Sequence, residues 1–175
     1  PYTPTPAGTR TVIEPDPFAG FIIGFQPTRP SSRGRIDISA NDPLAPPRIR
    51  PNSLATPEDQ AQVIAGGLLC QRLAKTAAIT GLIKAPMGED LRQMTPEQIL
   101  ADFRARSGTV FHPIGTCRMG EDISHSVVCP RLKVHGVSGL RVVDASVFPN
   151  ITSGNTNAPT MMLALRAADL ILEDA

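Results

Sequence analysis

Proline and glycine are unevenly distributed along this sequence, and their positions restrict where regular secondary structure can form. The 18 prolines and 14 glycines crowd into the first 52 residues and into the segments around His112 and Asn155. Proline has no backbone N–H to donate, and glycine allows turns that other residues resist. We therefore expect a loop-rich chain of short elements, with an irregular stretch over residues 1–17.

Two stretches carry clear helix-start signals. Thr56-Pro57-Glu58-Asp59 joins a capping threonine to a proline suited to the first helical position and to two acids that favour the positive end of the helix dipole. Thr95-Pro96-Glu97-Gln98 is a second start with a full capping box, and its helix should end near Arg106.

The first of these helices should run to about Ala77. Gly66 and Gly67 lie inside it, and each costs roughly 1 kcal/mol relative to alanine in a helix interior. The pair therefore indicates either a close contact with another helix or a kink. Apolar spacing predicts a buried face made of Ala61, Ile64, Ala65, Leu68, Leu69 and Leu73.

Short strands are expected where apolar residues alternate or cluster between turn residues. These segments are Phe21–Phe25, Arg35–Ser39, Arg48–Arg50, Arg131–Val134 and Leu140–Asp144.

A last helix is expected from Ala158 to about Glu173, with Asn157 as its N-cap. Apolar residues lie almost all round it, so it should be deeply packed. Its start is small and polar from Ser153 to Thr160, and a buried helix start needs partners for its free N–H groups. This start is either an ordinary capped helix or a site for the polar edge of an anionic ligand.

His112 stands on a constrained segment, Phe111 to Gly120. Pro113 biases it toward an extended backbone, and Gly115 and Gly120 permit turns on either side. Functional side chains are often held on such segments, although a surface-loop histidine fits the same residues. The other two histidines, His125 and His135, are expected to be solvated loop residues.

Composition excludes several classes of function. A net charge of +1 without a basic block, and few aromatic residues, argue against nucleic-acid binding. No apolar run approaches the roughly 20 residues of a membrane span. Cys70, Cys117 and Cys129 match neither a zinc pattern nor a disulfide framework, so we expect reduced thiols, no zinc and a cytoplasmic protein.

Three ordered motifs resemble the C-terminal part of the glucose–methanol–choline (GMC) family of flavin oxidoreductases. They are His112-Pro113-x-Gly115-Thr116-Cys117-Arg118-Met119-Gly120, Gly136-Val137-x-Gly139-Leu140-Arg141-Val142-Val143-Asp144-Ala145-Ser146, and Asn155-Thr156-Asn157-Ala158-Pro159-Thr160. Upstream, Pro30-x-Ser32-Arg33-Gly34-x-Ile36 followed by Asp42-Pro43 is similar to strands of the family's substrate domain. The alcohol and choline dehydrogenase-like branch is the most similar.

The resemblance implies an α+β fold, with a mostly antiparallel sheet and packed helices plus a C-terminal remnant of the FAD-binding domain. Residues 1–110 would be part of the substrate-binding domain. Residues 111–175 would hold the histidine segment and the last piece of the FAD-binding domain. The sequence lacks the Gly-x-Gly-x-x-Gly of a dinucleotide fold, so the N-terminal Rossmann half is expected to be absent.

The resemblance also assigns roles to residues. His112 would take the alcohol proton while hydride passes to flavin N5, and Asn155 would hold the same oxygen. Asp144 and Ala145 would approach the ribityl and pyrophosphate groups of FAD. Thr156 and Asn157, at the helix start, would face the pyrimidine edge of the flavin, where the dipole favours negative charge.

Several alternatives stay open at this stage. An FAD-containing lyase shares the fold, and a piece without its nucleotide-binding half could be a non-catalytic binding or structural module. The expected partners are a small-molecule alcohol and the missing N-terminal half, with self-association possible. The fragment alone should bind FAD weakly and be inactive. Neither the alcohol nor the electron acceptor, oxygen or a quinone-like carrier, follows from the sequence, and membrane association of the intact enzyme is not excluded.

Overall fold

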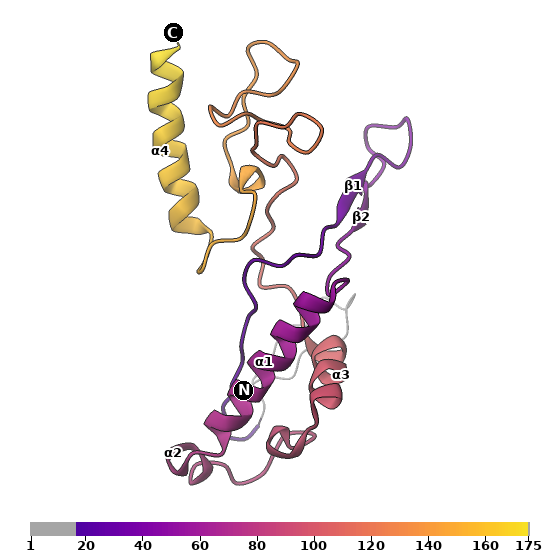
Figure 1. Ribbon diagram of the computed structural model, residues 1–175, viewed down its shortest axis with the longest axis vertical. Helices are drawn as coiled ribbons and strands as arrows, with labels where there is room; N and C mark the ends of the chain where they lie inside the picture. The colour runs from indigo at the N-terminus through magenta and orange to yellow at the C-terminus, as the bar shows by residue number, and fades with distance from the viewer. Residues whose placement is uncertain (1–16, 175) are drawn as a thin grey trace.

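The computed structural model describes residues 17–174, so the expectation for residues 1–16 lies outside it. The elements in chain order are β1 (Arg35–Asp37), β2 (Arg48–Arg50), α1 (Pro57–Ala74), α2 (Ala77–Thr80), η1 (Leu91–Gln93), α3 (Pro96–Arg106), η2 (Ala145–Val147) and α4 (Asn157–Glu173) (Figure 1). The α+β class is confirmed, and loops dominate as the proline and glycine content predicts. None of the helices within residues 17–174 combines the length and the apolar character that a membrane span requires.

The sheet is small. β1 and β2 form an antiparallel hairpin in which Ile36 lies opposite Ile49, and the pair projects away from the helices (Figure 1). The segments 131–134 and 140–144, expected to be strands, form only isolated bridges, such as the one between Lys133 and Arg141.

The expectation of a strand over residues 21–25 is wrong. Phe25 instead packs on the helices, with its ring centroid 5.4 Å from that of Phe103 on α3. Phe21 and Ile22 are exposed, and the segment forms no strand. Side-chain packing on α1 and α3 thus replaces the sheet pairing that the composition favoured.

α1 and α3 lie side by side, with Gly67 of α1 at the contact (Figure 1). A Cβ atom on Gly67 would overlap the side chain of Ile99 on α3, and one on Gly66 would overlap the ring of Phe25. This supports the close-contact alternative for the glycine pair. Both helices begin as predicted, because Thr56 accepts from the Asp59 N–H and Thr95 forms a capping box with Gln98.

The predicted buried face of α1 is wrong. The buried residues are Asp59, Val63, Gly67, Cys70 and Ala74. Leu68, Leu69 and Leu73 remain 37–45% exposed. Apolar residues occur on more than one side of this helix, and the glycines let α3 approach from one side only, so that side is the one buried. The helix also ends at Ala74, three residues earlier than expected.

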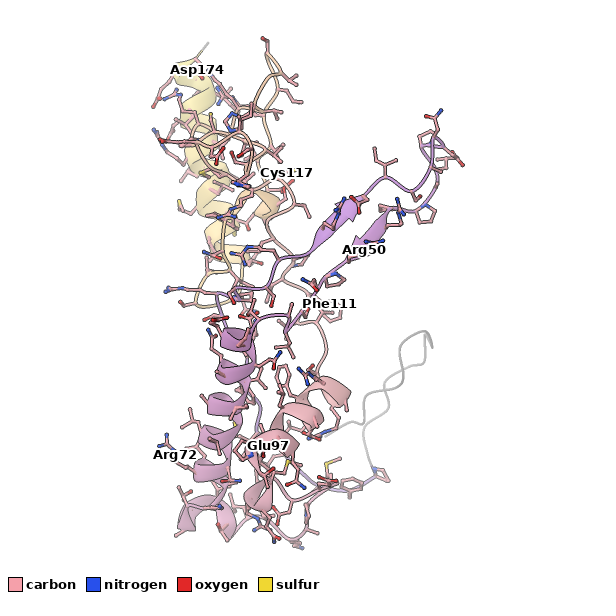
Figure 2. The ribbon with its side chains drawn as sticks, turned by 45° about the vertical axis from the view of Figure 1, so that its right-hand side comes forward. Arg50, Arg72, Glu97, Phe111, Cys117 and Asp174 are labelled. Atoms are coloured by element: carbon pink, nitrogen blue, oxygen red, sulfur yellow. The ribbon has the colours of Figure 1, made fainter. Side chains whose placement is uncertain are left out.

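A second apolar cluster lies between α4 and the loops of residues 117–148. Its buried members are Val128, Leu132, Val147, Leu163 and Ala167. Backbone hydrogen bonds fix the loops, as where the N–H groups of Cys117 and Met119 donate to Ser146 O at 3.1 Å and to Val147 O at 2.9 Å. Figure 2 shows Cys117 beside α4 in this part of the molecule.

α4 is less deeply packed than its sequence predicts. Only Leu163, Ala167 and Leu170 are buried. Met161, Met162, Leu165 and Leu172 are 60–76% exposed. At its C-terminal end, Asp174 forms ion pairs with Arg131, Lys133 and Arg141, which tie the helix to the bridged loops.

Candidate functional site

His112 lies on the loop that follows α3, at the junction between the α1–α3 part and the α4 part of the molecule. Its neighbour Phe111, labelled in Figure 2, has a φ of 61°. This left-handed conformation is uncommon for a bulky side chain and persists only where surrounding structure holds it. The Phe111 N–H donates to Thr109 Oγ1 at 3.0 Å, which helps to hold the turn. Such strained residues cluster at functional sites.

The imidazole of His112 contacts the start of α4. Its Nδ1 lies 3.0 Å from Thr156 Oγ1, across 44 residues of sequence. His112 is half-buried and Thr156 is only 8% exposed, so the contact is shielded from solvent. His112 Nε2 has no hydrogen-bond partner among residues 17–174 and faces away from this contact as the free nitrogen of the ring.

Asn155 precedes Thr156 and is exposed. Its side chain makes no hydrogen bond within the described part of the chain, which leaves its amide available to a ligand. The two residues expected to be catalytic therefore lie on segments that meet, one at the histidine loop and one at the N-terminus of α4. Sequence reasoning placed Thr156 toward a cofactor, and the structure adds its contact with His112.

The start of α4 differs from the expectation in one detail. Thr156, not Asn157, is the N-cap, and Asn157 is the first helical residue. The Thr156 hydroxyl bonds to His112 and makes no capping bond, and the first turn holds no acidic residue. The N–H groups of Asn157 and Ala158 consequently lack a partner within the helix, in a field that favours negative charge.

Asp144 and Ala145 lie at η2, next to the histidine segment. Asp144 is exposed, and its Oδ1 accepts from the Ser146 N–H at 2.7 Å. The hydroxyl of Ser146 is buried and has no partner in the part of the chain that the structure describes. A buried hydroxyl without a partner is costly and uncommon, so this atom is a candidate contact for a bound group. Sequence reasoning gave Ser146 no role, although it stands in the same motif.

The other two histidines differ from each other. His125 is exposed, as expected. His135 is half-buried, and its Nε2 lies 3.1 Å from both Ser126 Oγ and Gly120 O. The expectation of a solvated His135 is therefore wrong, because the ring holds the loop of residues 120–126 together.

No metal site is formed by the described residues, since no three histidine, cysteine, aspartate or glutamate side chains converge within 17–174. The cysteines are free; burial raises the pKa of the Cys70 thiol on α1, which disfavours the reactive thiolate.

Comparison with known proteins identifies relatives. A family model described as GMC oxidoreductase matches residues 30–164. An alcohol dehydrogenase [acceptor] from Pseudomonas putida is 40% identical over 153 residues, which is 87% of this chain and 28% of the relative. An oxygen-dependent choline dehydrogenase from Paraburkholderia xenovorans (strain LB400) is 39% identical over 152 residues, or 87% of this chain and 27% of the relative. This chain thus spans little more than a quarter of the length of these two relatives.

Solved structures agree with these relatives. An FAD-dependent oxidoreductase from Chaetomium thermophilum superposes with a TM-score of 0.75 at 29% identity, covering 84% of this chain and 26% of that one. A fungal aryl-alcohol oxidase superposes with a TM-score of 0.72 at 31% identity, covering 83% and 24%.

Proposed function

The chain belongs to the GMC oxidoreductase family, and from that premise we propose that it is the C-terminal part of an FAD-dependent enzyme that oxidises the CH–OH group of an alcohol. The members and solved neighbours of this family use FAD. The named activities of the relatives, on alcohols and choline, support an alcohol as substrate.

One observation carries the proposal: the hydrogen bond between His112 Nδ1 and Thr156 Oγ1, at 3.0 Å. It fixes the imidazole against the start of α4 and leaves Nε2 free. A histidine held by one nitrogen and free at the other is suited to act as a general base.

The residues around this contact fit FAD. Three features favour its polar groups: the unpartnered N–H groups of Asn157 and Ala158, the buried Ser146 hydroxyl, and the turn at Asp144 and Ala145. These residues would hold FAD, and when bound it would take up the hydride from the alcohol carbon. The absence of acidic residues in the first turn of α4 suits a ligand that gathers negative charge.

The chain's own groups would then handle the hydroxyl. His112 Nε2 accepts its proton, which requires Nδ1 to carry a hydrogen and donate it to Thr156 Oγ1. Asn155 donates an amide N–H to the same oxygen and orients it without competing for the proton. Because the C–H hydride leaves more readily as the O–H proton departs, both residues act on the same step.

We propose the same division into domains that the resemblance implies. Residues 1–110 would belong to the substrate-binding domain and 111–175 to the FAD-binding domain. We also propose that this chain self-associates when it is separated from the N-terminal half. Two separate apolar clusters support a boundary near residue 110, one between α1 and α3 and one between α4 and the 117–148 loops.

Anaerobic addition of alcohols to the intact enzyme tests the proposal. We expect an FAD spectrum that bleaches when an aliphatic, aromatic or choline-like alcohol is added. A yellow protein that turns over substrate without bleaching would instead be a lyase on this fold. A protein that carries this sequence within a full-length family member and binds no flavin would be a binding or structural module.

A further inference from the structure

We propose that Arg29 and Arg33 are positioning residues for the site described above: they hold the loop of residues 148–155 so that Asn155 and Thr156 meet His112. The inference rests on the proposed function, because it concerns the same site. Neither arginine lies close to His112 in sequence, and each acts through the loop.

Both arginines reach across the molecule to this loop. Arg29 Nη2 donates to Ser153 Oγ at 3.1 Å, over 124 residues of sequence. Arg33 Nη2 donates to Asn150 Oδ1 at 3.0 Å, over 117 residues. The two attachment points lie two and five residues before Asn155, on the stretch that leads into α4.

The loop has little else to fix it. Asn150, Ser153, Gly154 and Asn155 are all exposed, and its own internal side-chain bond joins Thr152 Oγ1 to Gly154 O at 3.0 Å. An exposed segment of this kind is mobile unless it is tied to a rigid element. Two guanidinium contacts on one side of the loop therefore limit where Asn155 can stand.

Arg33 is itself held rigidly. Its Nη1 donates to Pro30 O at 2.6 Å and to Ser32 O at 3.0 Å, so the planar guanidinium is fixed on its own turn before it reaches Asn150. A lysine has a single point charge on a flexible stem and cannot keep these three contacts together.

The turn that carries both arginines is anchored to α1. Asp59, which is 4% exposed, accepts the backbone N–H groups of Ser31 at 2.7 Å and of Ser32 at 2.9 Å. It also accepts both serine hydroxyls. A connected path of hydrogen bonds thus runs from the buried Asp59 carboxylate in α1, through Ser32 and Arg33, to the loop before α4.

The backbone of Arg29 supports the same conclusion. Its φ of 61° is left-handed, a conformation that is unfavourable for a residue with a side chain. Strain of this kind persists where the surroundings over-determine it, and it aims the guanidinium at Ser153.

Kinetics of the intact enzyme test the positioning role. We expect Arg33→Lys and Asn150→Ala each to lower kcat about tenfold or more while KM changes by less than about threefold, because orientation rather than binding is lost. The double variant should have a kcat no lower than that of either single variant, since both substitutions remove the same hydrogen bond. Arg35→Lys, at the next arginine along the chain, is the matched control and should keep the wild-type kcat. The proposal would be overturned if the kcat losses of the two single variants added up in the double variant. It would also be overturned if the kcat losses paralleled a loss of bound FAD or a lower melting temperature.

A second measurement does not depend on activity. The 175-residue chain has three histidines, so ¹⁵N-histidine NMR can resolve the ring of each. Arg33→Lys should shift the His112 ring signals and leave those of His125 unchanged, and Arg35→Lys should shift neither. An unchanged His112 would contradict the positioning role. If the wild-type enzyme oxidises no alcohol, the proposed function fails, and this spectrum alone decides whether the arginines position the histidine.

Discussion

At the scale of single residues, the site consists of one imidazole, one amide and one hydroxyl drawn from two distant motifs. His112 and Asn155 could be singled out from their motifs before the fold was known. The contact between His112 and Thr156 could not, because a threonine before a helix predicts a capping bond, and nothing local indicates that its hydroxyl turns to a histidine instead.

The Thr156 hydroxyl gives the first prediction. Thr156→Val removes the hydrogen bond to His112 Nδ1 and nearly conserves volume, and kcat/KM for alcohol oxidation should fall about tenfold, the equivalent of one hydrogen bond of roughly 1.4 kcal/mol. Thr156→Ser keeps the hydroxyl and serves as the control, with activity within about twofold of wild type. Equal losses in the two variants would mean that the methyl group, not the hydroxyl, matters here.

At the scale of elements, the starts of α1 and α3 and the two strands were predictable, and the packing of the helices was not. Thr56 and Thr95 carry their signals within four residues, and both helices begin there. The buried side of α1 depends on which face α3 approaches, and periodicity is ambiguous when leucines occupy one side and small residues another. The prediction of a strand over residues 21–25 was wrong for a related reason, since Phe25 packs against Phe103 on α3, which lies 78 residues later in the sequence.

The glycine contact between α1 and α3 can be tested by stability. Gly67→Ala gains roughly 1 kcal/mol of helix propensity but forces a methyl group into Ile99, and overpacking typically costs about 1–3 kcal/mol. We expect net destabilisation and a lower melting temperature in thermal unfolding. Gly88→Ala is the control, because a Cβ there meets nothing within 4 Å. A Gly67→Ala variant more stable than wild type would show that the helices are less closely packed.

The buried Asp59 carboxylate should make the stability of the fold depend on pH. Burial alone would raise the pKa of Asp59, but the hydrogen bonds from Ser32 and Ser31 outweigh it and hold this pKa well below its usual range. A carboxyl with a lowered folded-state pKa stabilises the fold above its unfolded pKa, roughly 4, and this contribution is lost as pH falls below that value. Asp59→Asn should therefore lower the melting temperature at pH 7. Between about pH 5 and 3, the melting temperature of the variant should fall less than that of the wild type. If the melting temperature of the variant falls between about pH 5 and 3 as steeply as that of the wild type, this assignment is refuted.

At the scale of the whole molecule, the chain carries apolar surface on α4 that the described residues do not cover. Met161, Met162, Leu165 and Leu172 lie on that surface. The sequence predicted a deeply packed helix from their spacing, and only the side toward Leu163 and Ala167 is packed. The family resemblance and the α+β class could be recognised from ordered motifs, because those motifs are local and do not depend on which surfaces are covered.

This surface predicts behaviour of the separate chain. Exposed apolar patches favour association, so the 175-residue chain should form concentration-dependent oligomers in sedimentation experiments and should carry little or no flavin. Met162→Lys with Leu165→Lys should reduce the association. Leu44→Lys is the control, since Leu44 is 89% exposed and belongs to the loop between β1 and β2, a hairpin that lies away from α4 (Figure 1). A yellow monomer with one flavin per chain would contradict both parts.

The central claim is that His112 is the base for the alcohol proton, and one comparison of turnover tests it most directly. In the intact enzyme, His112→Ala should lower kcat by roughly 10²–10⁴ without loss of FAD, the usual share of general base catalysis. Asn155→Ala should cost less, because it affects orientation alone. His125→Ala, at an exposed loop histidine, should keep the wild-type rate. A His112→Ala enzyme that binds FAD and turns over within about threefold of wild type would contradict the account.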